Sequence, residues 1–312
     1  MSTSDTAIET QGLTKHYGDV AALVDLDLEV IRGEVFGFLG PNGSGKTTMI
    51  RTILDEIRPT AGTASIVGLD SHRDAVEIRR HIGYVPGDLA LYPDLTGRDT
   101  ITFFANLRGG VDWSVVERLA ERFDADLAKK IGDLSTGNRQ KVGLSQAFMN
   151  EPEVLIMDEP SVGLDPLVQR EFHALVREVA AEGRSVFLSS HTLSEVQRVA
   201  DRVGIIRHGR LAAVEALHDL RAKALRRVEL DFAGPGGADR LRDVPGVREL
   251  EVTGDRVTVA FAGEIAALLG ALAGGPDLVD ISTRDADLEE IFLTYYRDDP
   301  DPGIATESRP RP

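Results

Sequence analysis

The sequence predicts an α/β protein whose core is a mainly parallel sheet with helices on both faces. Apolar runs at residues 34–39, 154–157 and 185–189 have the composition of strands that are buried on both sides. Helical patterns separate these runs, and strands that alternate with helices are typical of a parallel sheet. A chain of 312 residues is long enough for one such domain and for a second, smaller one.

The remaining elements of the large domain follow in chain order. Residues 7–35 alternate in short β-like runs separated by turn residues, which indicates an antiparallel β-subdomain. The pattern turns helical from Thr96 to Asn150, which indicates a helical insert at about 87–150. The other expected elements are a helix at 48–54, strands at 63–67 and 82–85, a helix at 167–181 and a closing hairpin at 203–212.

The stretch after the strand at 34–39 is the most informative in the chain, because it satisfies the full P-loop pattern. It reads Gly40, Pro41, Asn42, Gly43, Ser44, Gly45, Lys46, Thr47 and Thr48. Glycines let the backbone curl so that its N–H groups point inward, and the dipole of the following helix adds partial positive charge. Lys46 would reach the β- and γ-phosphates of a nucleoside triphosphate, and the Thr47 hydroxyl would lie on Mg²⁺. The pattern therefore predicts a P-loop NTPase core.

A second motif ends the strand at 154–157, where Asp158 and Glu159 follow the apolar run. An aspartate at the end of a hydrophobic strand can hold Mg²⁺ directly or through water. The adjacent Glu159 could polarise the water that attacks the γ-phosphate. A carboxylate pair at a strand end is common by itself, and the P-loop upstream is what favours the catalytic interpretation.

The bulk composition excludes several classes of protein. The formal net charge of −16 argues against broad nucleic-acid binding, because phosphate backbones recruit basic faces. The absence of cysteine excludes a disulfide framework and a thiolate metal site, which fits a cytoplasmic protein. No apolar run approaches the length of a membrane span, and the polar, acidic residues 1–10 do not resemble a signal peptide.

The character of the sequence changes near Leu220. The remainder reads as strand 227–232, helix 237–243, strands 247–253 and 256–261, helix 264–273 and strand 278–283. This βαββαβ order predicts a small α+β, ferredoxin-like C-terminal domain. The expected organisation is therefore an ATP-binding domain at 1–219, an accessory domain at 220–297 and a disordered tail at 298–312.

The motifs together resemble those of the ATP-binding subunits of ABC transporters, over about residues 7–215. Residues 134–141 look like the family's LSGGQ signature with its basic flank, although Thr136 and Asn138 depart from it. Residues 161–166 resemble the D-loop. Two further features are Ser189-Ser190-His191, which resembles the family's switch histidine, and Tyr17, which lies where the family carries an aromatic side chain that stacks on adenine.

The resemblance implies that two copies of the chain form a homodimer with ATP at the interface. Ser135 and the backbone of Gly137, at a helix start, would form a second anion cradle that faces the γ-phosphate bound to the other subunit. His191 would contact the γ-phosphate and help hold the attacking water, and Asp165 would link the two sites. ATP binding would then close the dimer, and hydrolysis would open it.

The resemblance also implies a partner and a location. Because the chain shows no membrane segment, transport would need a separate transmembrane permease, and the subunit would lie peripherally on the cytoplasmic face of the cell membrane. Residues 287–296 look like the closing helix of ABC-2-type exporter ATPases, such as daunorubicin- and multidrug-resistance subunits, which favours export. Leu91 and Tyr92 could contact a coupling helix of the permease or could simply pack inside the insert. The exported substrate stays open.

The chain departs from the family at one loop, where Gly87 stands in place of a glutamine that touches Mg²⁺ and the membrane partner. Either Asp88 takes over the metal contact, or nothing replaces the glutamine and turnover or coupling is slower. The glycine also keeps open an alternative function, a soluble regulatory ATP sensor. A role in nucleic-acid or ribosome remodelling is disfavoured by the single ATPase core and the acidic charge.

Overall fold

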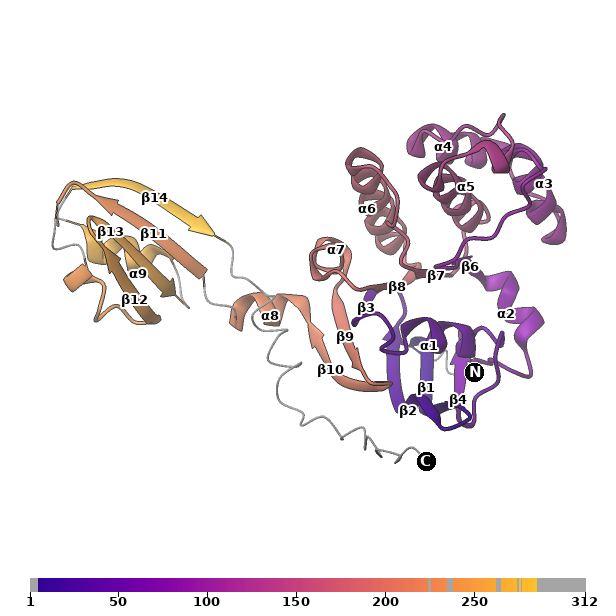
Figure 1. Ribbon diagram of the computed structural model, residues 1–312, viewed down its shortest axis with the longest axis horizontal. Helices are drawn as coiled ribbons and strands as arrows, with labels where there is room; N and C mark the ends of the chain where they lie inside the picture. Colours follow the sequence, from indigo (N-terminus) through magenta and orange to yellow (C-terminus); the bar gives the residue numbers. More distant parts are fainter. Residues whose placement is uncertain are drawn as a thin grey trace, which may run out of the picture. The chain divides into compact units, whose positions relative to one another are not determined.

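The computed structural model describes residues 5–223, 226–234, 238–261, 265–273, 275 and 277–284. The chain divides into two units, Met1–Leu217 and His218–Pro312. In the described part, the first unit contains a six-stranded and a four-stranded sheet, and the second unit contains one four-stranded sheet (Figure 1).

The six-stranded sheet is the mainly parallel sheet that the sequence predicts. Its order is β10-β9-β3-β8-β7-β6, and only the β9–β10 hairpin is antiparallel. Every residue of its three central strands is buried, as expected where helices cover both faces. The strands are β3 (Val35–Leu39), β6 (Ile82–Val85), β7 (Val154–Asp158), β8 (Ser185–Ser190), β9 (Arg202–Arg207) and β10 (Arg210–Ala216).

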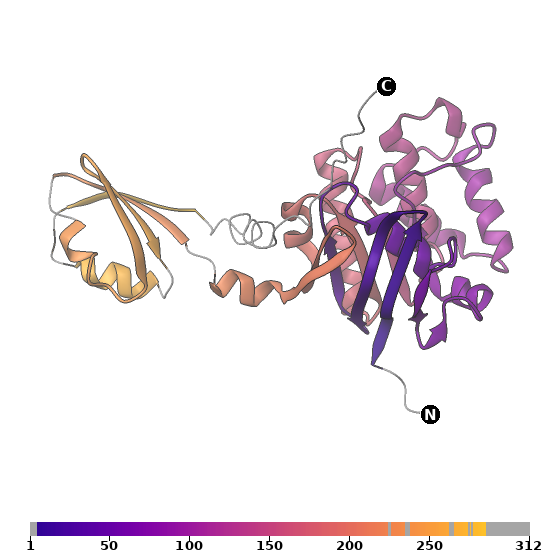
Figure 2. The same cartoon turned by 60° about the horizontal axis from the view of Figure 1, so that its bottom comes forward.

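The antiparallel β-subdomain is also present, but its first two strands are longer than the short runs that the sequence indicated. Register shifts occur between Thr10 and Leu13 and between Leu13 and Lys15, so the apolar alternation breaks while the strand continues. The order is β2-β1-β4-β5, with the strands side by side in Figure 2. They are β1 (Thr6–Tyr17), β2 (Val20–Ile31), β4 (Ala61–Ile66) and β5 (Leu69–Asp70).

Helix α1 (Lys46–Ile53) lies against both sheets and fixes the loop that precedes it. Its Met49, Ile50 and Ile53 are fully buried in one apolar cluster with residues of β1, β2 and β4 and of β3, β7 and β8. The loop before α1 is therefore held between two sheets. The other helices of the core are α2 (Ala75–His81), α6 (Pro166–Ala181) and α7 (Leu193–Val199), and the short α2 and α7 were not predicted.

The predicted helical insert contains three α-helices that lie together in Figure 1. They are α3 (Gly97–Leu107), α4 (Trp113–Phe123) and α5 (Thr136–Phe148), with a 3₁₀ turn η1 (Ile131–Asp133) before α5. Thr96 and Asp99 form a capping box at the start of α3, which explains why the helix begins there. Helix α5 contacts α3, α4 and β6, so it joins the insert to the core.

The second unit has the strand order of a ferredoxin-like fold, β12-β13-β11-β14, with all pairs antiparallel. The helix predicted at 237–243 is only a 3₁₀ turn, because Gly236 and Gly237 precede it and Pro245 follows it. The elements are α8 (Leu217–Lys223), β11 (Arg226–Phe232), η2 (Ala238–Arg240), β12 (Val247–Thr253), β13 (Arg256–Phe261), α9 (Ile265–Leu272) and β14 (Leu278–Arg284). The helix predicted at 287–296 and the tail predicted at 298–312 lie outside the described residues.

Candidate functional site

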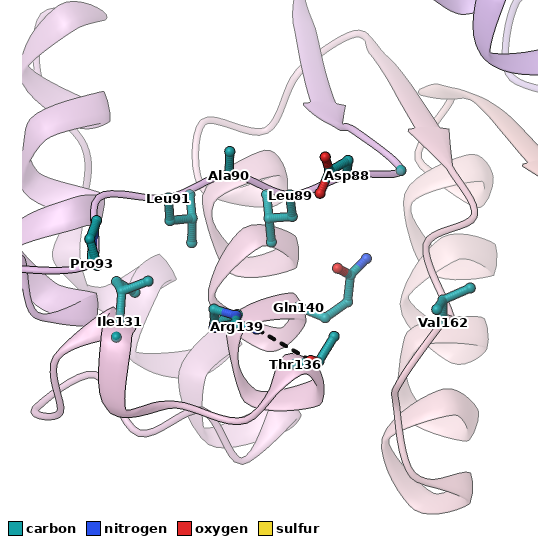
Figure 3. A pocket seen from close by; sticks show the side chains of 12 residues that line it. Asp88, Leu89, Ala90, Leu91, Pro93, Ile131, Thr136, Arg139, Gln140 and Val162 are labelled. Atoms are coloured by element: carbon teal, nitrogen blue, oxygen red, sulfur yellow. Dashed lines mark hydrogen bonds between the residues drawn. The ribbon is translucent and has the colours of Figure 1, made fainter.

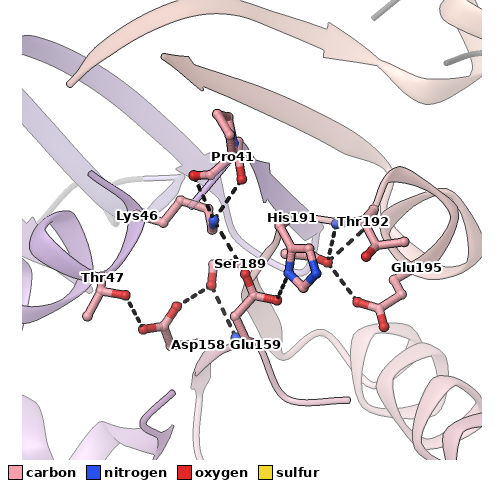
Figure 4. Close-up of polar contacts among 11 residues, drawn as sticks. Pro41, Lys46, Thr47, Asp158, Glu159, Ser189, His191, Thr192 and Glu195 are labelled. Atoms are coloured by element: carbon pink, nitrogen blue, oxygen red, sulfur yellow. Dashed lines mark hydrogen bonds and ion pairs between the residues drawn. The ribbon is translucent and has the colours of Figure 1, made fainter. Parts of the chain in front are cut away.

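Three neighbouring parallel strands end at one edge of the six-stranded sheet, and the residues that follow them meet there (Figure 4). Asp158 of β7 lies opposite Ser189 of β8, and Leu39 of β3 lies opposite Ser190. Because the carboxyl ends of parallel strands share an edge, this register brings together the P-loop, the carboxylates after β7 and the segment after β8. Three motifs that are far apart in the sequence therefore form one site.

The loop between β3 and α1 has the backbone of an anion cradle. Gly43 and Gly45 have φ angles of 79° and 112°, which residues with a Cβ rarely adopt. Gly45 is the N-cap of α1, and no side chain caps the helix there. Lys46 Nζ donates to the carbonyl oxygens of Gly40 at 2.7 Å and Pro41 at 3.3 Å, which holds the ammonium group against the loop.

A second observation in the same loop fits a phosphate ligand. The Ser44 hydroxyl is only 4% exposed and has no hydrogen-bond partner among the described residues. A buried polar atom without a partner costs free energy that a bound oxyanion would recover. Two other predicted residues, Asn42 and Thr48, lie on the exposed turn of the loop and in the first turn of α1.

Asp158 is almost fully buried, and two hydroxyl groups hold its carboxylate. Thr47 Oγ1 donates to Oδ2 at 2.7 Å, and Ser189 Oγ donates to Oδ1. Buried carboxylates need such partners, and the sequence did not identify Ser189 as one. Burial, with smaller contributions from the Glu56 and Asp158 charges, raises the pKa of Tyr84 and keeps this neighbouring phenol neutral.

Glu159 lies between two nitrogen atoms of the site (Figure 4). Its Oε1 is 3.3 Å from Lys46 Nζ, and its Oε2 is 2.8 Å from His191 Nδ1. Its backbone has a φ of 50°, and its N–H donates to the carbonyl oxygen and Oγ of Ser189, both at 3.2 Å. A non-glycine residue in this left-handed region is uncommon and persists where its surroundings hold it.

Helix α7 fixes the loop that carries His191, a contact that the sequence analysis missed. Ser190 Oγ lies 2.7 Å from Glu195 Oε2 and accepts a hydrogen bond from Thr192 N at 2.9 Å. Thr192 and Glu195 have the spacing of a capping box, and this spacing could have predicted the start of α7 from the sequence. The Thr192 side chain does not cap the helix, and Glu195 binds Ser190 instead.

The two residues predicted to form the signature, Ser135 and Gly137, lie at the start of α5. Ser135 is the N-cap of this helix, and its Oγ accepts from Asn138 N at 3.3 Å. Gly137 packs against the loop after β7 so closely that a methyl group there would overlap the Gly163 carbonyl oxygen. Among the described residues, no hydrogen bond or ion pair joins Ser135 or Gly137 to the P-loop.

Asp165 also lies apart from the P-loop and caps α6. Its Oδ1 accepts from Leu167 N at 3.1 Å and from Val168 N at 3.0 Å. The Val168 N–H above all, with a smaller contribution from the Lys141 charge, lowers the pKa of Asp165. In one chain Asp165 is therefore a helix cap that stays ionised at neutral pH.

Two other predicted site residues are exposed. Tyr17, at the end of β1, is 49% exposed, and Lys15 Nζ lies 5.0 Å from the centre of its ring. Asp88 follows Gly87, and no hydrogen bond or ion pair of Asp88 occurs within the described structure. A Cβ at Gly87 would lie 3.0 Å from Asp158 Oδ2, so the backbone of this loop passes beside the buried carboxylate.

A groove lies between the loop after β6 and the start of α5, with a volume of about 220 Å³ (Figure 3). Asp88 lies near one end, and Arg139 lies on α5. The apolar lining residues are Leu89, Ala90, Leu91, Pro93, Ile131 and Val162. Tyr92, for which a partner contact and packing inside the insert were both open, is 56% exposed and packs edge-on against Phe103 of α3.

A P-loop between two sheets, a buried aspartate bound to the P-loop threonine, and a glutamate beside the P-loop lysine define a nucleotide-binding ATPase domain. Sequence comparison places the domain in a family. The ABC transporter profile matches residues 23–162. The daunorubicin resistance ATP-binding protein of Streptomyces coeruleorubidus is 36% identical over 311 residues, which cover 95% of this chain and 98% of that protein.

Two further comparisons agree. The bacitracin transport ATP-binding protein of Bacillus licheniformis is 31% identical and covers 92% of this chain and 96% of that protein. A solved ATP-binding subunit of an ABC transporter is 32% identical, with a TM-score of 0.64 over 70% of this chain and 93% of that one. The chain belongs to the ABC transporter family, as an ATP-binding subunit of the ABC-2 exporter type.

Family membership confirms the predicted ATPase and exporter class. ATP is the nucleotide that this family binds, so the P-loop prediction is confirmed at that level. None of the proteins compared favours the ATP-sensor or nucleic-acid alternatives. Among the described residues, no helix is both long and apolar enough to cross a membrane.

Proposed function

We propose that this chain powers export through a separate transmembrane permease, by closing and opening a homodimer with ATP between its two copies. The observation that carries the proposal is that the two halves of the predicted site lie at the starts of two different helices. Lys46, Asp158 and Glu159 meet at one sheet edge, whereas within the described residues no hydrogen bond or ion pair joins Ser135 or Gly137 to the P-loop. A second copy of the chain would bring such a helix start to the P-loop.

The hydrolytic step in this proposal uses groups that are already positioned. Lys46 and the N–H groups at the start of α1 offset the charge that develops on the phosphoryl oxygens. Glu159 acts as the general base and accepts a proton from the attacking water. His191, whose Nδ1 lies 2.8 Å from the other oxygen of Glu159, would orient the same water. Tyr17 offers an exposed ring to the adenine.

Thr47 and Asp158 would hold Mg²⁺, which supplies charge neutralisation across the β- and γ-phosphates. Their oxygen atoms, 2.7 Å apart, are the hard donors that this ion prefers. The described residues contain no cluster of three or more His, Cys, Asp or Glu side chains that could hold a metal. The nucleotide and water, with or without Asp88, would supply the other ligands.

Asp88 either contacts the metal in place of the missing glutamine or does not, and the two alternatives predict different Mg²⁺ dependence of the ATPase activity. If Asp88 contacts the metal, Asp88→Ala raises the Mg²⁺ concentration needed for half-maximal ATPase activity by about tenfold. If nothing replaces the missing glutamine, Asp88→Ala has the same Mg²⁺ dependence as wild type. Asp94→Ala, in the same exposed loop, is the matched control.

We propose the groove of Figure 3 as the permease contact, with the chain on the cytoplasmic face of the membrane. Its apolar floor and its two charged residues suit a short amphipathic segment. Leu91→Ala combined with Tyr92→Ala should reduce co-purification with the permease. Unchanged co-purification would contradict this contact.

Light scattering of Glu159→Gln with and without Mg-ATP tests the dimer. Glu159→Gln should bind ATP without hydrolysing it, so the mass should double when Mg-ATP is added. Glu121→Gln, an exposed change on α4, should behave as wild type. A Glu159→Gln protein that binds ATP and stays monomeric at every concentration would contradict the ATP-closed homodimer.

A further inference from the structure

One side of α5 is joined to the loop that follows Glu159 in the same chain. Three contacts make this junction, which we call the α5 seam. Gly137 packs on the Gly163 backbone, Gln140 Nε2 donates to the Pro160 carbonyl oxygen at 3.0 Å, and Lys141 Nζ lies 3.7 Å from Asp165 Oδ2. Residues 137, 140 and 141 are spaced i, i+3 and i+4, so they share one helix face.

The two α5 side chains of the α5 seam are buried, whereas its Asp165 carboxylate is half exposed. Gln140 is 7% exposed and Lys141 is 6% exposed. Lys141 Nζ also lies 3.3 Å from the Asp124 carbonyl oxygen, at the C-terminal end of α4, where a cation is favourable. Buried amide and ammonium groups cost free energy unless they are paired, so these contacts are expected to persist.

The loop held by the α5 seam begins at the residue next to Glu159. Pro160, whose carbonyl oxygen binds Gln140, follows Glu159 directly, and Glu159 has a left-handed backbone. On its other side Glu159 is held by the two hydrogen bonds from its N–H to Ser189. The direction of the Glu159 side chain therefore depends on anchors from β8 before it and from α5 after it.

We propose that Gln140 and Lys141 are positioning residues that set the orientation of the Glu159 carboxylate from the signature helix of the same chain. The proposal rests on the general-base role given to Glu159 above. Within the described residues, neither side chain has a hydrogen bond or ion pair with the P-loop, so their effect on the reaction passes through the 160–165 loop. In the proposed dimer, the N-terminus of α5 serves one ATP and Glu159 of the same chain serves the other. The α5 seam would thus join the two ATP sites.

Volume-conserving substitutions separate positioning from packing. Gln140→Met keeps the size of the side chain and removes the donor to Pro160, and Lys141→Met removes the charge. We expect kcat for ATP hydrolysis to fall about tenfold in each, because a small displacement of a catalytic group is costly. KM for ATP should stay within about twofold, because the P-loop is untouched. Lys141→Arg should recover most of the lost kcat.

Val142→Ala is the matched control for lost stability, since Val142 is fully buried in the same helix and lies outside the α5 seam. It should lower Tm while leaving kcat near that of wild type. An unchanged kcat in Gln140→Met and Lys141→Met would overturn the proposal, as would an equal fall in Val142→Ala. The ATPase rate of Glu159→Gln is measured in the same experiment. If this variant still hydrolyses ATP, the general-base role of Glu159 is wrong, and this result differs from an unchanged kcat in Gln140→Met and Lys141→Met.

Discussion

Two helices of this chain begin at glycine-containing motifs, and their first turns are built in opposite ways. Helix α1 starts after Gly45 with no side-chain cap, and its first residue, Lys46, is buried against Glu159. Helix α5 starts after Ser135, whose own hydroxyl caps the helix, and Ser135 is exposed. Both starts expose N–H groups that can bind an anion.

The difference lies in what surrounds each helix start. Side chains from three strand ends converge on the start of α1, so one chain supplies both the anion cradle and the catalytic groups. At the start of α5, the Ser135 hydroxyl caps the helix itself and Gly137 packs on the loop at 161–166. A helix start without catalytic groups can still bind a phosphate that a second molecule holds. Substitutions at the start of α1 and at the start of α5, made separately, test this difference.

The largest effect is expected at the start of α1. Lys46→Met removes the ammonium group that lies 3.3 Å from Glu159, so it should reduce hydrolysis by at least about 100-fold and weaken ATP binding. Steady-state ATPase rates and nucleotide titrations measure both effects. Lys129→Met changes an exposed lysine of the insert and should leave both near wild type. Hydrolysis in Lys46→Met within a few-fold of wild type would contradict the role of Lys46.

A smaller effect is expected at the start of α5, where two functions of Ser135 can be separated. Ser135→Ala removes the cap and should destabilise the protein by about 1 kcal/mol. Ser135→Asn keeps a capping side chain and should restore that stability. If the hydroxyl acts on a phosphate, both substitutions should lower the ATPase rate about tenfold, with monomer ATP affinity unchanged. Full ATPase activity in Ser135→Asn would show that Ser135 is only a cap.

The same two regions show what the sequence could and could not predict. The P-loop and the Asp158–Glu159 pair were predicted because local residue types dictate their geometry: a glycine turn after a buried strand, and carboxylates at a strand end. The contacts of Ser189 with Asp158 and of Gln140 with Pro160 were missed. Each depends on strand order or helix placement, which are tertiary properties that a motif does not contain.

The fold shows the same division. The strand Val154–Asp158 was predicted to within one residue, at 154–157, because burial on both faces leaves a continuous apolar run in the sequence. The strands β1 and β2 were predicted as fragments, because register shifts break their alternation. The left-handed backbone of Glu159 could not be predicted, since the residue has no intrinsic preference for it and only its neighbours hold it there.

A third test compares one glycine from each helix start. Gly137→Ala would place a methyl group onto the Gly163 carbonyl oxygen, so it should destabilise the protein by about 1–3 kcal/mol. A Cβ at Gly43 would meet nothing within 4 Å, and only its φ of 79° opposes the change, at about 1 kcal/mol. Denaturant unfolding measures both. A larger loss in Gly43→Ala would contradict the tight packing of the α5 seam.

The smallest effect concerns pH and Asp165, which caps α6 beside the α5 seam. The Val168 N–H lowers the pKa of Asp165, so the folded protein favours the ionised form more than the unfolded chain does. The ionised Asp165 carboxylate therefore contributes its full stabilisation at a pH above about 3.9, the pKa of Asp in the unfolded chain. This stabilisation is lost as the pH falls through the lower pKa of Asp165 in the folded protein. Asn caps a helix as well as Asp does, so Asp165→Asn removes only the charge. It should lower Tm by about 1–2 °C at pH 7 and match wild type at low pH.

Asp165→Ala, which loses the cap, should have a lower Tm than wild type at every pH. If the difference between wild type and Asp165→Asn grows as the pH falls from 7 to about 3, the carboxylate does not stabilise the loop in its ionised form.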